Sequence, residues 1–182
     1  MPVTPRETSV VEHEVRVAAR PETVFAYFTD PSKMIEWMGA QATLDPRPGG
    51  VCRIVFQPPQ ERVDSVSAGF GVSEPPAGGA PANVGVMMGE FVEVDPPRHI
   101  AFTWGWEQEL LATPPQSTAV DVSLTPDGDE TVVRLAHRRI PAAAVAFHRA
   151  GWGHYLPRLA TAAAGGDPGP DPWQRTVTPL AG

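Results

Sequence analysis

The 182-residue sequence predicts one α+β domain, in which a curved antiparallel sheet packs against a long C-terminal helix. Several segments alternate apolar and polar side chains, as strands with one buried face do. Two short helical segments follow the first of these strands, and the longest helical pattern comes after the last. A chain of this length with 42% hydrophobic residues can bury one core, so we expect a single domain over residues 9–164.

The N-terminal part predicts a strand and then two short helices, after an extension over residues 1–8. Residues 9–18 alternate, and one face of that strand would carry Val11, His13, Val15 and Val17. Pro21 suits the first turn of a helix over about 21–28. Asp30 can cap a second helix that begins at Pro31 and ends at Gly39.

The middle of the chain predicts strands separated by turns. A turn at 48–50 leads into a strand that carries Cys52, Ile54 and Phe56 on one side. Residues 57–83 are rich in proline and glycine, lack an apolar period and are expected to form an insertion loop. Four further antiparallel strands are expected within residues 84–94, 99–109, 117–126 and 130–140.

The last predicted element is a helix over about 141–164, followed by a proline- and glycine-rich tail over 165–182. Its apolar face would carry Val145, Trp152, Tyr155, Leu156 and Leu159. Within "FHRAGWGHYLPRL" stand Gly151, Gly153 and Pro157, which an ordinary core helix avoids. Either the helix bends there and leaves a void above the sheet, or the glycines admit Trp152 and Tyr155 against bulky sheet residues.

Five segments in this order resemble the helix-grip fold of the START-like, or SRPBCC, superfamily. The likeness extends to homologues of the C-terminal domain of the activator of the heat-shock-chaperone ATPase. The segments are "PETVFAYFTDPSKMIEWMG", "RPGGVCRIVF", "GEFVEVDPPRHIAFTW", "VRLAHRRIP" and "GWGHYLPRL". The resemblance implies a last helix that lies across the mouth of a sheet-lined cavity for an apolar ligand. It is less informative about function, because the superfamily includes lipid and hormone binders, polyketide cyclases and chaperone cofactors.

His137 is the first candidate site residue. It is in step with Val133 and Leu135, so its imidazole should face the apolar side, where it can orient a ligand or exchange a proton. The alternative is a core histidine bonded to the backbone. Glu90 shares its parity with Met88, but the opposite parity of Phe91 favours an outward, solvated carboxylate.

Aromatic residues supply the other candidates. Ile100, Phe102, Trp104 and Trp106 share one strand face, with Trp106 nearest to a pocket mouth, and His148 and Trp152 share one helix face. Either they line a pocket or they form a tight core. The expected ligand-binding residues are Trp37, Met38, Phe56, Met88, Phe102, Trp104, His137, His148, Trp152 and Tyr155.

The sequence offers no support for metal binding, a cofactor or covalent catalysis, because none of their motifs is present. The formal charge of −7, the single Cys52 and the lack of a leader or a membrane-spanning run predict a cytoplasmic protein without nucleic-acid or membrane partners. A homodimer stays open. We expect a module that binds a small apolar ligand; the alternatives are a cyclase-like or hydrolase-like enzyme that uses the same cavity and a chaperone cofactor that acts through its surface.

Overall fold

The computed structural model describes residues 8–59, 85–107 and 112–174. The expected order of strand, two short helices, strands and one long helix is confirmed. The elements are β1 (Thr8–Val17), α1 (Pro21–Thr29), α2 (Pro31–Trp37), β2 (Gln41–Leu44), β3 (Val51–Phe56), β4 (Gly85–Asp95), β5 (His99–Trp104), β6 (Thr118–Asp127), β7 (Glu130–Pro141), the short 3₁₀ turn η2 (Ala142–Ala144) and α4 (Val145–Ala163). Most of the expected insertion, residues 60–83, lies outside the described residues, as do residues 1–7 of the extension and 175–182 of the tail.

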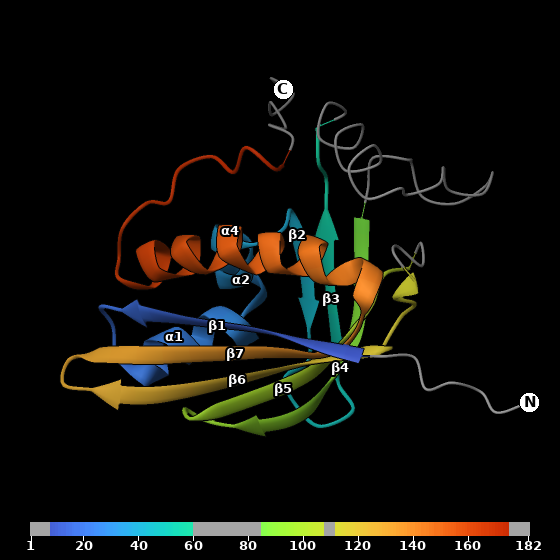
Figure 1. Ribbon diagram of the computed structural model, residues 1–182. Coiled ribbons are helices and arrows are strands. Elements are labelled where there is room, and N and C mark those ends of the chain that lie inside the picture. The colour runs from blue at the N-terminus through green and yellow to red at the C-terminus, as the bar shows by residue number, and fades with distance from the viewer. Residues whose placement is uncertain (1–7, 60–84, 108–111, 175–182) are drawn as a thin grey trace, which may run out of the picture.

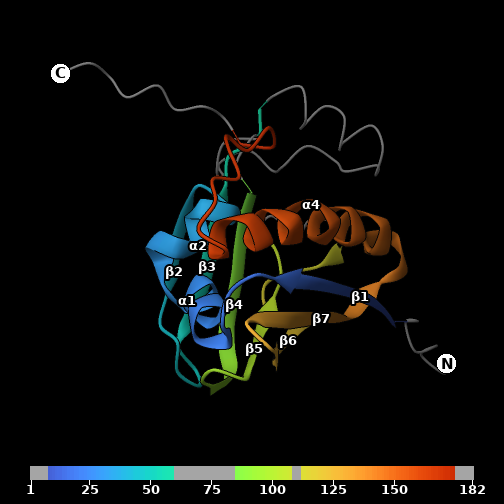
Figure 2. The same ribbon diagram turned by 90° about the vertical axis from the view of Figure 1, so that its left-hand side faces the viewer.

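The described strands form one antiparallel sheet in the order β1-β7-β6-β5-β4-β3-β2. The sheet curves strongly, so that β2, β3 and β4 stand across the direction of β1 and β7, and α4 lies across the concave side (Figure 1). Helices α1 and α2 cover one end of that side (Figure 2). This is the α+β helix-grip fold that the sequence predicted. No helix among the described residues is long and apolar enough to cross a membrane.

Alternation along the strands separates the core from solvent. On β7, Val133, Leu135 and His137 are at most 1% exposed and face α4, whereas Arg134 is exposed on the opposite face. On β5, Ile100, Phe102 and Trp104 are likewise buried. The inward position expected for His137 is therefore confirmed.

The N-terminal cap of α2 is also as expected, and α1 begins at Pro21 without a side-chain cap. The Asp30 carboxylate accepts a hydrogen bond from the backbone N–H of Ser32, at 2.8 Å, and so caps α2. Gly39 follows α2 with a φ of +80°, a left-handed conformation that suits glycine. The strand β2 was missed, because its four residues pair only with β3 at the edge of the sheet and are too few for a clear pattern.

The prediction that Met88 lines the interior is wrong. Met88 lies opposite Arg53 on the outer face of the sheet, whereas Met87 lies opposite Ile54 and is fully buried. Two consecutive methionines fit either parity, and the register that buries Phe91 and Ile54 decides between them. The same register puts Glu90 on the outer parity, as preferred, and an irregularity in the β4–β5 pairing follows between Phe91 and Glu93.

Helix α4 runs without interruption through Pro157, and its glycines do not serve a close approach to the sheet. A methyl group at Gly151 would meet nothing within 4 Å, and one at Gly153 would lie 3.8 Å from His13 Cε1, an ordinary contact. Gly153 and Pro157 are both exposed. The interpretation of these glycines as spacers against the sheet is therefore wrong.

Candidate functional site

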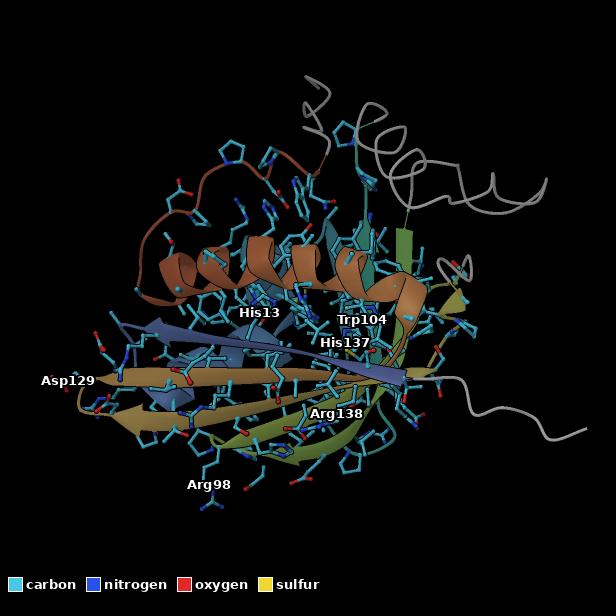
Figure 3. The ribbon with its side chains drawn as sticks, in the orientation of Figure 1. His13, Arg98, Trp104, Asp129, His137 and Arg138 are labelled. Carbon is cyan, nitrogen blue, oxygen red and sulfur yellow. The ribbon has the colours of Figure 1, made fainter. Side chains whose placement is uncertain are left out.

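Seven aromatic and imidazole rings meet where the N-terminal half of α4 crosses the sheet. We call them the ring cluster; none is more than 8% exposed, and they are Phe56, Trp104, Trp106, His137, His148, Trp152 and Tyr155. Four of them come from strands β3, β5 and β7 and from the segment just after β5, and the other three come from α4. Trp104 and His137 lie between α4 and the sheet, whereas Arg138 is on the other side of the sheet (Figure 3).

Trp104 lies at the centre of the ring cluster. Its ring centroid is 5.2 Å from that of Trp152 and 5.7 Å from those of Trp106 and His137. The Trp104 and Trp106 rings are nearly perpendicular, at 86°, which is a favourable edge-to-face arrangement. Phe102 packs beside Trp104 at 6.4 Å, so this predicted residue adjoins the cluster.

Both ring nitrogens of His137 are bonded within the protein. The Trp152 Nε1–H donates to His137 Nδ1 at 3.1 Å, and because an indole N–H can only donate, Nδ1 carries no proton. His137 Nε2 therefore holds the proton and donates to Thr118 Oγ1 at 2.7 Å, while the Thr118 hydroxyl donates to the Trp104 carbonyl at 2.8 Å. A ligand can reach these nitrogens only by displacing Thr118 or Trp152, so a direct role for the imidazole stays a prediction.

His148 has the complementary tautomer. Its Nε2 accepts from Trp106 Nε1–H at 3.3 Å, and its Nδ1–H donates to the Ala144 carbonyl at 2.8 Å. The His137 and His148 ring centroids lie 4.8 Å apart. His148 and Trp152 were predicted to share a helix face, and both are buried in this cluster.

The two histidines are held neutral. Burial lowers the pKa of His148 to about 4, although the bond to the Ala144 carbonyl acts in the opposite direction. Burial, and secondarily the neighbouring His148, lower the pKa of His137 well below its ordinary value. Both imidazoles of the ring cluster are therefore uncharged at neutral pH.

One polar atom of the ring cluster has no hydrogen-bond partner. Trp104 is only 4% exposed, and its Nε1 is buried from solvent and has no hydrogen-bond partner. Buried donors without partners are rare in folded proteins and costly. The sequence could predict an inward Trp104 from strand parity, but not the direction of its N–H.

Besides Met88, two further predicted ligand residues lie away from the ring cluster. Trp37 packs edge-on against Phe28, and its Nε1–H donates to the Tyr27 carbonyl at 3.0 Å. This places Trp37, and with it the adjacent buried Met38, at the α1–α2 end of the domain. The sequence put both on an apolar helix face correctly but could not tell which part of the core that helix covers.

The first part of the tail docks back over α4, as its path along the helix shows (Figure 1). Trp173 stacks on His154 with centroids 3.8 Å apart, and His154 Nε2 pairs with Asp171 Oδ1 at 2.8 Å. Gln174 bridges Tyr155, whose hydroxyl accepts a hydrogen bond, and the backbone N–H of Gln57. Arg158 donates to two tail carbonyls, those of Pro168 and Gly169. We call residues 165–174 the docked tail; the sequence left open whether Trp173 docks.

The described residues give little basis for covalent or metal chemistry. Burial raises the pKa of the Cys52 thiol to about 12, so it is not a nucleophile at neutral pH. No group of three His, Cys, Asp or Glu side chains in the described part of the chain is placed to hold a metal ion. A hollow on the outer face of the sheet is charged rather than apolar, and its lining includes Glu12, Glu14, Asp121, Arg134 and Arg138.

A curved antiparallel sheet that holds one long helix over an aromatic interior defines a START-like, helix-grip domain. The sequence profile described as "Activator of Hsp90 ATPase homolog 1-like protein" matches residues 18–164, and the chain belongs to this family. A search of curated proteins found no match.

Solved structures agree with this assignment. An AHSA1-like protein of Rhizobium etli is 35% identical, with 97% of this chain and 94% of that one covered and a TM-score of 0.62. DynU16, from the dynemicin biosynthetic locus, is 22% identical with a TM-score of 0.65; the match covers 91% of this chain but 51% of DynU16. Protein CV1439 of Chromobacterium violaceum is 19% identical over 92% of this chain and 100% of its own, with a TM-score of 0.64. The last two support the fold alone.

Proposed function

We propose that this protein binds a small, neutral, planar apolar molecule at the ring cluster, between the sheet and the N-terminal half of α4. The observation that carries the proposal is the composition of this cluster: five aromatic side chains surround two imidazoles that are neutral at physiological pH. Aromatic faces favour flat apolar partners, and an uncharged interior imposes no need for a charged one.

Binding is favoured over catalysis because the polar groups of the cluster are already committed. His137 and His148 each use both ring nitrogens in bonds to protein atoms. General acid–base chemistry needs a group free to exchange a proton with the substrate. The enzyme alternative therefore receives less support than a binding module.

Nuclear magnetic resonance of the five indole N–H groups tests the proposal within one sample. The probe is 2-ethylnaphthalene, a flat molecule without polar atoms, titrated into nitrogen-15-labelled protein. We expect the indole signals of Trp104, Trp106 and Trp152 to shift together and saturate. The Trp37 signal should stay in place, because that indole is bonded to Tyr27 at the other end of the core.

Paired variants check that the site is specific. Trp152→Ala should weaken probe binding by about tenfold or more, since it removes a ring of the cluster. Trp37→Phe, a change in an equally buried tryptophan, should leave the affinity within about twofold. Absence of any saturable shift, or equal shifts at Trp37 and in the cluster, would contradict the proposal.

A further inference from the structure

The hydrogen bonds of the ring cluster leave one donor over. The indole N–H of Trp152 is taken by His137 and that of Trp106 by His148. The protons of the two imidazoles go to Thr118 Oγ1 and the Ala144 carbonyl, and the Tyr155 hydroxyl accepts from Gln174. Only the Trp104 N–H is buried without a partner among the polar side-chain atoms of this cluster.

The chemistry of this atom restricts what can satisfy it. An indole nitrogen donates one hydrogen bond and accepts none, so its partner must be an acceptor. The other indoles and imidazoles of the cluster offer no free acceptor nitrogen, because His137 Nδ1 and His148 Nε2 are already occupied. The ring nitrogens of the cluster therefore supply no acceptor for the Trp104 N–H.

We propose that the Trp104 N–H is the polar recognition point of the site, and that the ligand is a flat aromatic molecule carrying a neutral oxygen acceptor, such as an aryl ketone or quinone carbonyl. This inference rests on the function proposed above. A carboxylate fits poorly, because the cluster contains no lysine or arginine and a buried anion needs a charged or multiply bonded partner.

A matched pair of probes isolates this one hydrogen bond. The ketone 2-acetylnaphthalene and the hydrocarbon 2-ethylnaphthalene have nearly the same shape and differ in a carbonyl oxygen. Both probes should shift the Trp104 indole proton signal through the ring current of the naphthalene. We expect the ketone to move it further downfield than the hydrocarbon does, because a hydrogen bond to the N–H adds a downfield shift. This measurement uses the unmodified protein and so does not depend on the folding of a variant.

Affinities from isothermal titration calorimetry give the second measurement. The ratio of ketone to hydrocarbon affinity should fall by about tenfold in Trp104→Phe, which removes the N–H and keeps an aromatic ring. Trp37→Phe removes an indole N–H whose partner is the Tyr27 carbonyl, and the same ratio should not change.

The outcomes separate the two proposals. If both probes bind and neither the Trp104 proton nor the affinity ratio distinguishes them, the hydrogen-bond inference is overturned and the proposed binding site stands. If neither probe binds, the proposed function fails and the inference fails with it. A Trp104 signal further downfield with the ketone than with the hydrocarbon, together with loss of the preference in Trp104→Phe, supports both.

Discussion

The two halves of α4 cover different kinds of core. The N-terminal half lies on the ring cluster, where neutral imidazoles and indoles form directed hydrogen bonds. The C-terminal half buries Leu156, Leu159 and Ala162 and packs against α1 and α2. There the Tyr27 hydroxyl donates to the Ala162 carbonyl and Arg158 to the Trp37 carbonyl, whereas the side chains that this half buries are apolar. The C-terminal half of α4 is thus held mainly by burial of apolar side chains, whereas the contacts of the N-terminal half depend on the directions of hydrogen bonds.

The largest expected effect tests the packed half. Leu159→Ala should lower the free energy of unfolding by about 2–5 kcal/mol, because Leu159 is fully buried and truncation leaves a cavity. Urea denaturation measures this loss. Binding of 2-ethylnaphthalene by the folded fraction should not change. A loss below about 1 kcal/mol would mean that this half is not closely packed and would remove the contrast between the halves.

Acidification tests the polar half. The pKa of His148 is lower in the folded state than its ordinary value of 6.5, so the unfolded chain binds more protons and stability falls with falling pH. Stability contributed by this group is complete above about pH 6.5 and is lost toward pH 4, a change on the order of 3 kcal/mol. His137 acts in the same direction. Denaturation curves at several pH values between 7.5 and 4.5 measure the slope.

Two histidine variants distinguish the inner site from the surface. His148→Gln should flatten the acid slope. His99 lies on the outer side between Asp121 and Glu93; burial lowers its pKa, but the bonds and charges of the two carboxylates outweigh this and raise it. Stability from His99 is therefore present at low pH and lost as pH rises through that raised pKa. His99→Gln should not flatten the dependence of stability on acid pH. An equal flattening in both variants would argue against a special acid sensitivity of the ring cluster.

The smallest effect concerns the solvent side of the N-terminal half. Gly151→Ala should stabilise the protein by about 0.5–1 kcal/mol, because alanine favours a helix and its methyl group meets no other atom there. Thermal denaturation measures the gain. Gly39→Ala is the contrasting variant: its φ of +80° and the nearby Ile54 side chain make the change unfavourable. Destabilisation by Gly151→Ala would show that the helix needs its glycine for a contact or a bend.

Most of the fold could be predicted from the sequence, and the residues explain why. Strand parity placed His137, Trp104 and Phe102 on the buried face, and Asp30 and Gly39 marked the ends of α2. The prediction for Met88 failed because either of two adjacent methionines can face the core, so the local pattern does not choose between them. Local patterns are enough where one face of an element must be buried.

The candidate site could be predicted only in part, since it depends on contacts between distant segments. Trp37 and Trp152 have similar local patterns, yet one belongs to the α1–α2 end and the other to the ring cluster. The pairing of Trp106 with His148 and of Trp152 with His137 depends on side-chain rotamers and helix placement, which periodicity does not encode. The docked tail was ambiguous for the same reason.

The docked tail extends the packed structure beyond the end of the family match. The family match ends at residue 164, where α4 has just finished, yet Trp173 and Gln174 cover His154 and Tyr155. A protein shortened after residue 164 would keep every described helix and strand but would lose the contacts of Gln174 with the Tyr155 hydroxyl and of Trp173 with the ring of His154. Binding or stability measurements on a protein trimmed in this way would therefore describe a surface that the longer chain covers.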